Sequence, residues 1–296
     1  MDCFNDLFYI CSEKGNIYFY FLGKRFVFNK QAYLMKKLLL LISKNKNKKA
    51  LNLLKFIENK YGFNSIKNYL YIANFAYNTG YKKDKFEKAY FVYNALKRNE
   101  NEQRVEKYFQ NKTIAVVGNS GCELDKNRKD EIDSHNVVIR FNNYPSGYEK
   151  DYGQKTSVWV RCSSDEINDL RDLSQYDIVI WGYFDLENKP LKFNHLDILY
   201  RDLKLYPSKI NYIPKRYDIL TKNKLGVIPT MGAIMLCMLN DIQKNLKNVD
   251  VYGFSFLSDK KDSSHYYDDK CRIEKDHLEF SKEQQALRDL LKKQKG

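Results

Sequence analysis

Residues Thr113–Asn142, with the sequence TIAVVGNSGCELDKNRKDEIDSHNVVIRFN, hold the most informative pattern in the chain. An apolar run typical of a buried strand, Ile114–Val117, ends abruptly in the turn Gly118–Gly121 (GNSG). Glycines let a backbone turn sharply and approach a ligand closely. Such a turn leaves N–H groups and small polar side chains at the carboxyl edge of a sheet, where open α/β sheets bind nucleotides. We therefore expect a nucleotide to bind at this turn.

The turn does not match the two common phosphate-binding fingerprints. The pattern GxGxxG would need glycines at positions 120 and 123, where Ser120 and Glu123 stand. A Walker loop would need a Gly-Lys-Ser/Thr sequence after the turn, and none follows. On its own, GNSG is also compatible with an ordinary tight turn, so the assignment depends on the motifs around it.

From Thr113 onward the pattern alternates between strands and helices. The expected strands are 113–117, 137–141, 156–161, 177–182, 209–213 and 249–253, and the expected helices include 232–247 and 277–293. Alternation of this kind predicts an α/β fold, a Rossmann-like, mostly parallel sheet with helices on both faces.

The first part of the chain has a different character. Aromatic and β-branched residues over 16–28 predict a short hairpin, and apolar spacing over 31–60 and 64–98 predicts helices with a break at Thr79-Gly80. The helices resemble antiparallel pairs of the tetratricopeptide kind, with at most two units. Because the segment 99–112 is polar, we expect an N-terminal region over 1–111 and a Rossmann-like domain over 112–296.

The positive charge is concentrated in that N-terminal region. Residues 1–111 carry 21 Lys+Arg and 9 Asp+Glu, whereas residues 112–296 carry 30 and 28. One interpretation is codon bias, because Lys, Asn, Ile, Tyr and Phe are all abundant, as in AT-rich genomes. The other is attraction to an anionic membrane surface or to an acidic acceptor. No recognisable nucleic-acid-binding motif is present, so we expect no nucleic-acid partner.

Composition also indicates the compartment. The longest apolar run, Leu38–Ile42, is far too short to span a bilayer, and the first residues lack the features of a signal peptide. The 6 cysteines form no CxxC pair, which favours reduced thiols over a disulfide framework or a zinc site. We expect a cytoplasmic protein, with peripheral attachment to the inner membrane as one alternative.

Further motifs follow at a distance from the first. The sequence Pro229-Thr230-Met231-Gly232 precedes an apolar helix, so Thr230 and the next amides are expected at a helix N-terminus, which attracts anions. After it come VDVYGF at 249–254, SHYY at 264–267 and DHL at 276–278.

In this order and spacing, the motifs resemble those of the animal-type sialyltransferases, glycosyltransferase family 29. The large motif of that family is similar to VVGNSG…IDSH-VVIRFN…D-G-KTS, and its later motifs are similar to the Pro-Thr turn, VDVYGF, the His-Tyr-Tyr sequence and the last histidine. The resemblance covers roughly 113–290, and we expect nothing in 1–111 to belong to it. It implies a GT-A-like sialyltransferase variant of the Rossmann-like fold.

The resemblance implies transfer of sialic acid from CMP-sialic acid to a sugar hydroxyl, with inversion and without metal. It assigns contacts with the CMP part of the donor to Asn119, Ser120, Asn142, Thr230, Gly232 and Gly253. It makes His265 the donor of a hydrogen bond to the departing phosphate and His277 the general base. It also implies that one family disulfide is missing, since Ile114 takes the place of a cysteine.

The chemistry of the residues agrees with these roles. A CMP leaving group gains negative charge as the glycosidic bond breaks, and an imidazole with amide donors stabilises that charge. A neutral hydroxyl needs a base that titrates near working pH, which suits histidine. Of the remaining histidines, we expect a structural role for His135 and an incidental one for His195.

Metal dependence can be judged from the residues directly. Many nucleotide-sugar transferases hold a divalent ion on Asp-x-Asp, and this pattern occurs nowhere in the chain. The adjacent Asp268 and Asp269 would point to different faces of a strand and make a poor metal site. We therefore expect no metal and no cofactor; the CMP-sugar is a substrate.

Several departures from the family pattern leave alternatives open. Met231 replaces a threonine, Ile228 replaces an aromatic residue, and Lys282 stands where the family has a glutamate, so Glu279 or Glu283 is the candidate that orients His277. Because the first two changes lie around the donor, another CMP-activated acid sugar, such as Kdo or legionaminic acid, is the second hypothesis. A third is an inactive binding or scaffold relative. The acceptor, a bacterial capsule or lipooligosaccharide glycan in our leading hypothesis, is not fixed by the sequence.

Overall fold

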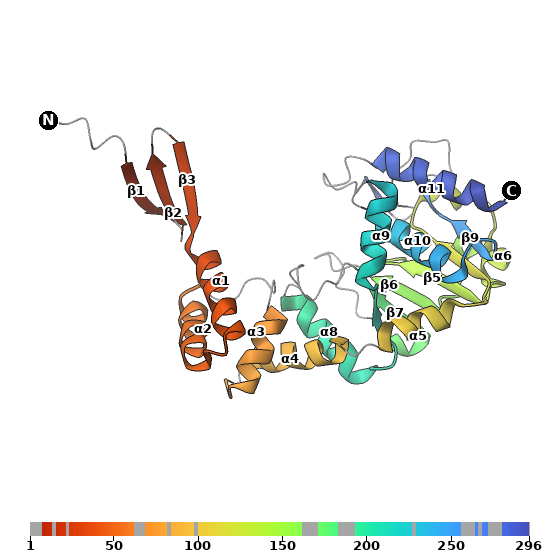
Figure 1. Ribbon diagram of the computed structural model, residues 1–296. Coiled ribbons are helices and arrows are strands. Elements are labelled where there is room, and N and C mark those ends of the chain that lie inside the picture. Colours follow the sequence, from red (N-terminus) through yellow and green to blue (C-terminus); the bar gives the residue numbers. More distant parts are fainter. Residues whose placement is uncertain are drawn as a thin grey trace. The chain divides into compact units, whose positions relative to one another are not determined.

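The chain divides into two compact units, and each is described here by itself. The computed structural model describes residues 8–13, 16–21, 24–61, 69–81, 84–97, 100–161, 171–182, 193–226, 229–255, 264–265, 268–271 and 280–295. One unit comprises Met1–Tyr93 with Leu186–Asp197, and the other comprises Asn94–Asp185 with Ile198–Gly296 (Figure 1). The division falls before the polar segment 99–112, which holds helix α5 (Glu100–Phe109) and belongs to the second unit.

The second unit is built on a six-stranded sheet whose strands are all parallel. The strands are β4 (Ile114–Val117), β5 (Val137–Phe141), β6 (Val158–Arg161), β7 (Ile178–Trp181), β8 (Ile210–Tyr212) and β9 (Val249–Tyr252). The order across the sheet is β8-β7-β6-β5-β4-β9. The expected Rossmann-like fold is confirmed, and each of the six expected strands is present.

The order in which strands are added to the sheet reverses between β4 and β9, although all the strands are parallel. From β4 to β8 each strand adds on the same side of its predecessor, but the chain then returns to place β9 on the other side of β4. In open α/β sheets, ligands bind beyond the carboxyl ends of the strands at such a reversal. The turn after β4 and the turn after β9 both lie at this position.

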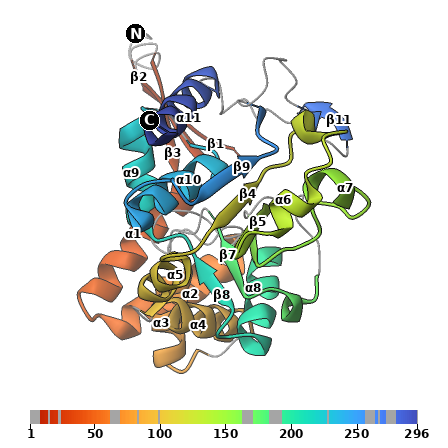
Figure 2. The ribbon, with the colours of Figure 1, turned by 90° about the vertical axis from the view of Figure 1, so that its right-hand side faces the viewer.

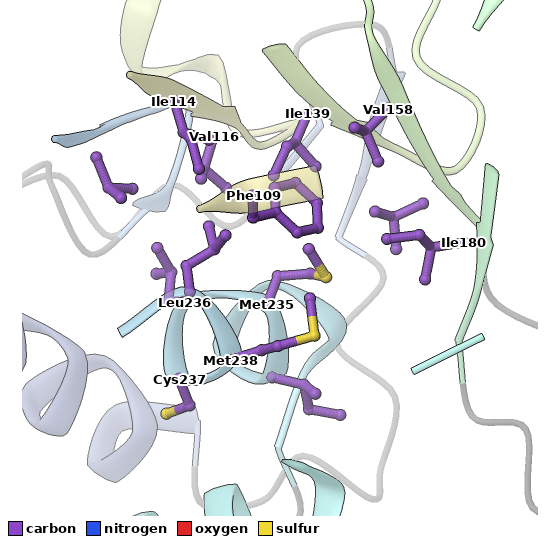
Figure 3. Close-up of a cluster of buried hydrophobic side chains, with 14 of the residues drawn as sticks. Phe109, Ile114, Val116, Ile139, Val158, Ile180, Met235, Leu236, Cys237 and Met238 are labelled. Atoms are coloured by element: carbon purple, nitrogen blue, oxygen red, sulfur yellow. The ribbon is translucent and has the colours of Figure 1, made fainter. Parts of the chain in front are cut away.

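One face of the sheet packs on helix α10 (Met231–Gln243), whose residues from Met231 to Leu239 are all buried. A helix that is apolar all round belongs in the interior. Figure 3 shows Met235, Leu236 and Met238 facing side chains of β4, β5 and β6. This core is what holds the carboxyl ends of the central strands in fixed positions.

Further helices complete both layers of the second unit. They are α6 (Lys129–Asp133), α7 (Glu149–Tyr152), α8 (Phe193–Leu205, which begins in the first unit), α9 (Lys215–Leu225) and α11 (Phe280–Lys295). Val105 and Phe109 of α5 and Leu287 of α11 join the α10 core, whereas Ile132 of α6 and Tyr152 of α7 pack on the opposite face of the sheet. Figure 2 shows α6 and α7 on one side of β4 and β5, with α10 and α11 on the other. A separate two-stranded sheet pairs β10 (Ser264–His265) with β11 (Asp268–Cys271).

The first unit begins with three antiparallel strands, β1 (Phe8–Glu13), β2 (Asn16–Phe21) and β3 (Lys24–Asn29). The pairing of β2 with β3 confirms the expected hairpin. β1 was not expected, because a short strand has little stability until a neighbour supplies its hydrogen-bonding partners. The sequence of β1 alone does not show that β2 will do so.

Four helices follow: α1 (Lys30–Ser43), α2 (Asn47–Tyr61), α3 (Tyr69–Asn78) and α4 (Asp84–Lys97), the last of which extends into the second unit. The break at Thr79-Gly80 is confirmed, since Gly80 has a φ of +77° and the Thr79 hydroxyl donates to Phe75 O over 2.9 Å. The rings of Tyr77 and Tyr90 stack with centroids 3.8 Å apart, which joins α3 to α4. Among the residues that the structure describes, no helix has the length and apolarity needed to cross a bilayer.

Candidate functional site

The turns after β4 and β9 cross at van der Waals distance. Gly118 N donates to Tyr252 O and Ser120 N donates to Gly253 O, each over 2.8 Å. A Cβ atom on Gly118 would lie 2.4 Å from Gly253 O, and one on Gly253 would lie 2.4 Å from Gly118 O. Two backbones can pass this closely only without side chains. The structure thus brings the first sequence motif and VDVYGF together, as expected for a single site.

A third glycine joins the same cluster through Phe254. A Cβ atom on Gly232, in the first turn of α10, would lie 2.4 Å from Cε1 of Phe254, and one on Gly118 would lie 3.0 Å from the same ring. The Phe254 ring also meets Phe141 edge-on, with centroids 6.2 Å apart. The N-terminus of α10 and the turn after β4 are therefore held against one aromatic side chain.

Asn119 and Asn142 lie at the carboxyl edge, after neighbouring strands. The Asn119 amide donates to Phe141 O over 3.1 Å, which places it against the end of β5. Asn142 has a φ of 51°, its N–H donates to Val160 O, and its carbonyl oxygen accepts from the Trp159 indole, both over 2.8 Å. Ser120 and Gly253 lie at the same edge, and Gly232 is joined to it through Phe254. The roles of these residues and of Thr230 in binding CMP stay predictions.

Thr230 caps helix α10, and Glu283 of α11 in turn binds Thr230. The Thr230 side-chain oxygen accepts from Ala233 N over 3.3 Å, which is the usual N-cap bond. The Glu283 carboxylate, 3% exposed, accepts from Thr230 N over 2.6 Å and from the Thr230 hydroxyl over 2.7 Å. A carboxylate is well placed at the positive end of a helix. Thr230 thus lies at a helix N-terminus, as expected, and the group bound there is the Glu283 carboxylate, while its contact with the donor stays a prediction.

Replacing Glu283 by alanine is expected to lower the free energy of unfolding by about 3 kcal/mol, because two hydrogen bonds to a buried carboxylate are lost. Glu283→Gln should keep part of this stability, since the amide can still accept from Thr230 N. Lys292→Ala, at an exposed position of the same helix, is the control. Denaturant titrations measure the free energy of unfolding of all three variants. Equal stabilities of Glu283→Ala and Lys292→Ala would show that the contact between Glu283 and Thr230 does not stabilise the fold.

Other polar residues of the first motif hold its loop in shape. Asp133 accepts from Gln154 N and Lys155 N, each over 2.9 Å, and Arg140 donates to the carbonyl oxygens of Tyr152 and Gly153. His135 is buried, and its Nε2 lies 3.0 Å from Asp250 Oδ2 on β9. The structural role expected of His135 is confirmed. These contacts fix the segment between β5 and β6 against the site.

Cys122 follows the glycine turn but is unsuited to covalent chemistry. Its Sγ lies 3.4 Å from Phe254 O. Burial raises the pKa of the Cys122 thiol to about 11, helped by the charge of Glu123, so the thiol stays protonated at neutral pH. Cys122 and the buried Cys237 are both free.

A cavity of about 730 Å³ opens beside the end of β5. Its walls include Tyr144, Arg171 and Tyr176, and Arg140 lies in its floor. The Arg171 guanidinium lies 4.0 Å from the Tyr144 ring centroid and donates to Tyr144 O, while the Tyr144 and Tyr176 hydroxyls are 2.9 Å apart. The volume is in the range of small-molecule pockets. The sequence did not point to this cavity, because Tyr144 and Arg171 belong to no motif.

Of the two expected catalytic histidines, the structure describes only the backbone of His265. The backbone of His265 lies in β10, where it pairs with Asp268 of β11. His277 and Glu279 lie outside the described residues, so their expected roles stay predictions. Glu283, the other candidate partner of His277, binds Thr230 through both oxygens, and its contact with His277 stays a prediction. Within the described ranges, no three His, Cys, Asp or Glu side chains are grouped so as to hold a metal ion.

Comparison with known proteins gives the family. The model of Glycosyltransferase family 29 (sialyltransferase) matches residues 41–170 and 188–295. The expectation that nothing in 1–111 belongs to the family is wrong, because the match starts within α1. The helices α2 to α5 carry apolar spacing rather than short polar motifs, so their relation to the family is not visible from motifs.

Individual relatives share shorter stretches. Beta-galactoside alpha-2,6-sialyltransferase 2 of Bos taurus is 52% identical over 50 residues, which are 17% of this chain and 10% of that protein. The Rattus norvegicus protein of the same name is 31% identical over 190 residues, 55% of this chain and 35% of that one. CMP-N-acetylneuraminate-beta-galactosamide-alpha-2,3-sialyltransferase 2 of Mus musculus is 27% identical over 182 residues, which are 57% of this chain and 49% of that protein. The chain thus spans less than half the length of these relatives.

A solved structure supports the fold. A crystal structure of a mammalian sialyltransferase superposes with a TM-score of 0.51 at 21% identity, over 76% of this chain and 83% of that one. At this identity the likeness concerns the fold alone. Because the family model matches most of the sequence, the chain belongs to glycosyltransferase family 29, the sialyltransferase family.

Proposed function

We propose that this protein transfers sialic acid from CMP-sialic acid to a sugar hydroxyl of a bacterial surface glycan, in a capsule or lipooligosaccharide, with inversion and without metal. The observation that carries the proposal is the crossing of Gly118 and Gly253 at the reversal of strand order. It leaves Asn119 and Ser120, which are partly exposed, at the position where such sheets bind nucleotides. Family membership supplies the donor.

The proposed mechanism gives each group one task. Asn119, Ser120 and Asn142 contact the phosphate and ribose, and Thr230, Gly232 and Gly253 hold the cytidine and ribose. His277 takes the proton of the acceptor hydroxyl as its oxygen attacks the anomeric carbon from the face opposite CMP. His265 donates a hydrogen bond to the phosphate oxygen that leaves. A single displacement of this kind inverts the anomeric configuration.

Another CMP-activated acid sugar, Kdo or legionaminic acid, is the second candidate donor. Met231 stands where the resemblance implies a threonine, and its side chain is buried against Gly182, within 2.0 Å of where a Cβ atom would lie. It therefore replaces a hydroxyl with a packed thioether close to the N-terminus of α10. This change in polarity favours testing donors beyond sialic acid.

The deciding experiment is a donor panel with purified protein and EDTA present. We expect turnover of CMP-sialic acid with release of CMP, at a rate that EDTA does not change. Turnover of CMP-Kdo or CMP-legionaminic acid alone would replace the first donor with the second. Loss of activity with EDTA would contradict the metal-free mechanism. If no donor is turned over and millimolar CMP fails to raise the melting temperature, the inactive-scaffold hypothesis is favoured.

The proposed place of work is the cytoplasm, at an anionic membrane surface where a lipid-linked acceptor is held. The motive is the charge distribution, since 1–111 carries most of the net charge of +14. Free Cys122 and Cys237 agree with reducing conditions.

A further inference from the structure

The helical pair α1–α2 has a surface that is strongly basic and partly apolar. Between residues 30 and 61 the chain has a single carboxylate, Glu58, which is buried and accepts a hydrogen bond from the Tyr81 hydroxyl. The lysines of this segment with described side chains are all exposed: Lys36, Lys37, Lys44, Lys46, Lys48, Lys49, Lys55 and Lys60. Positive charge therefore covers this surface without acidic side chains of the same segment beside it.

Four exposed residues of α1 form one stripe, which we name the α1 face: Tyr33, Lys36, Lys37 and Leu40. Their spacing of three and four residues puts them on one side of the helix. The opposite side carries Leu38 and Ile42, which are buried. Helix α1 therefore carries large apolar groups on its exposed side as well as on its buried side.

Two side chains of the α1 face are unusually exposed for their size. Tyr33 is 49% exposed and Leu40, two helical turns away, is 52% exposed. On α2, Phe56 is 46% exposed and the Lys60 ammonium lies 5.7 Å from its ring centroid. Single exposed apolar residues are ordinary on a protein surface. Here, however, Tyr33 and Leu40 share one stripe with two lysines, Lys36 and Lys37.

We propose that the α1 face docks on an anionic lipid bilayer. Each lysine near such a surface contributes about 1 kcal/mol of attraction. Tyr33 and Leu40 would enter the boundary between headgroups and acyl chains, as the apolar groups of interfacial helices do. The lysine stems lie along the same boundary while their ammonium groups reach the headgroups. The combination of apolar and basic groups favours a membrane over nucleic acid, which offers phosphates but no apolar layer at its surface.

The proposed function includes contact with an anionic membrane, and the α1 face is the part of the chain that would make this contact. The docking proposal rests on that function only for the reason why the protein would need a membrane. Its test needs neither donor nor acceptor, so failure of the transferase proposal and failure of docking are scored separately.

The test is flotation of the full chain with vesicles of phosphatidylcholine and phosphatidylglycerol, and with vesicles of phosphatidylcholine alone. We expect flotation with the anionic vesicles at low salt, weaker flotation as salt rises, and none with neutral vesicles. The double variant Lys36→Glu/Lys37→Glu should lower the partition coefficient by at least about 30-fold, because two lysine contacts are lost and the two new carboxylates are repelled by the surface. Tyr33→Ser/Leu40→Ser should lower it as well, with unchanged thermal unfolding because both side chains are exposed.

A matched control changes the charge by the same amount elsewhere. Lys247→Glu/Lys292→Glu, at exposed positions of the second unit, should float like the wild type. An equal loss in this control would overturn the proposal, because attraction would then depend on net charge alone. Failure of the wild type to float would overturn it directly. Binding of a DNA duplex that is lost in Lys36→Glu/Lys37→Glu, with flotation unaffected by Tyr33→Ser/Leu40→Ser, would assign the face to nucleic acid instead.

Discussion

Replacing His277 by alanine is expected to lower kcat by about 10²–10⁴-fold, the usual contribution of a positioned general base. The acceptor hydroxyl is a poor nucleophile until its proton is removed, so the loss should fall on the chemical step. CMP should bind with unchanged affinity, because the expected contacts with the nucleotide come from the edge of β4, β5 and β9. Steady-state kinetics and CMP titration calorimetry measure the two quantities.

His195→Ala is the control for this experiment, because His195 lies on α8 and belongs to none of the motifs. It should leave kcat unchanged. Full activity of His277→Ala would exclude the histidine as base. Loss of CMP binding together with activity would show instead that the segment around His277 shapes the donor site.

Gly253→Ala is expected to lower the free energy of unfolding by about 3 kcal/mol and to abolish CMP binding. Two costs combine: Gly253 has a φ of +66°, which disfavours a side chain, and the new Cβ would lie 2.4 Å from Gly118 O. The second contact is with backbone, so the turns after β4 and β9 must move apart. Denaturant unfolding and CMP titration measure both effects.

Gly226 provides a matched control for the cost of placing a side chain at a positive φ. Its φ is +68°, it ends helix α9, and a Cβ atom there would meet nothing within 4 Å. Gly226→Ala should therefore cost about 1 kcal/mol and leave CMP binding intact. If the two alanine variants were equally stable and bound CMP equally well, the close crossing would have no part in the site.

The sheet could be predicted from sequence because its strands are buried on both faces. Such strands are nearly continuous apolar runs, as in IAVV at 114–117 and IVIW at 178–181, and they stand out from a polar chain. Helix α5 could not be predicted from the sequence, because it has too few apolar residues to stand out from the polar segment that contains it. Its buried residues are Val105 and Phe109, one turn apart in a segment that is otherwise polar.

The parts of the site that could not be predicted all depend on contacts between distant segments. Spacing after His277 makes Glu283 a candidate partner of that histidine, and the structure adds a contact that spacing does not show, since the carboxylate binds Thr230 at the start of another helix. No periodicity or motif encodes a pairing of this kind. The motifs predict which residues contact the donor, a prediction that stays open, while the order of the strands that brings the turns after β4 and β9 together came from the structure.

The position of β9 has a consequence for biosynthesis. Ile114 pairs with Val249, so the strand that completes the nucleotide edge is made after every other strand of the large sheet. A nascent chain that ends before residue 249 exposes one flank of β4 and lacks half of the glycine crossing. Pairing over such a separation is slow compared with local folding. The nucleotide edge therefore cannot be completed during synthesis until β9 has been made and has paired with β4.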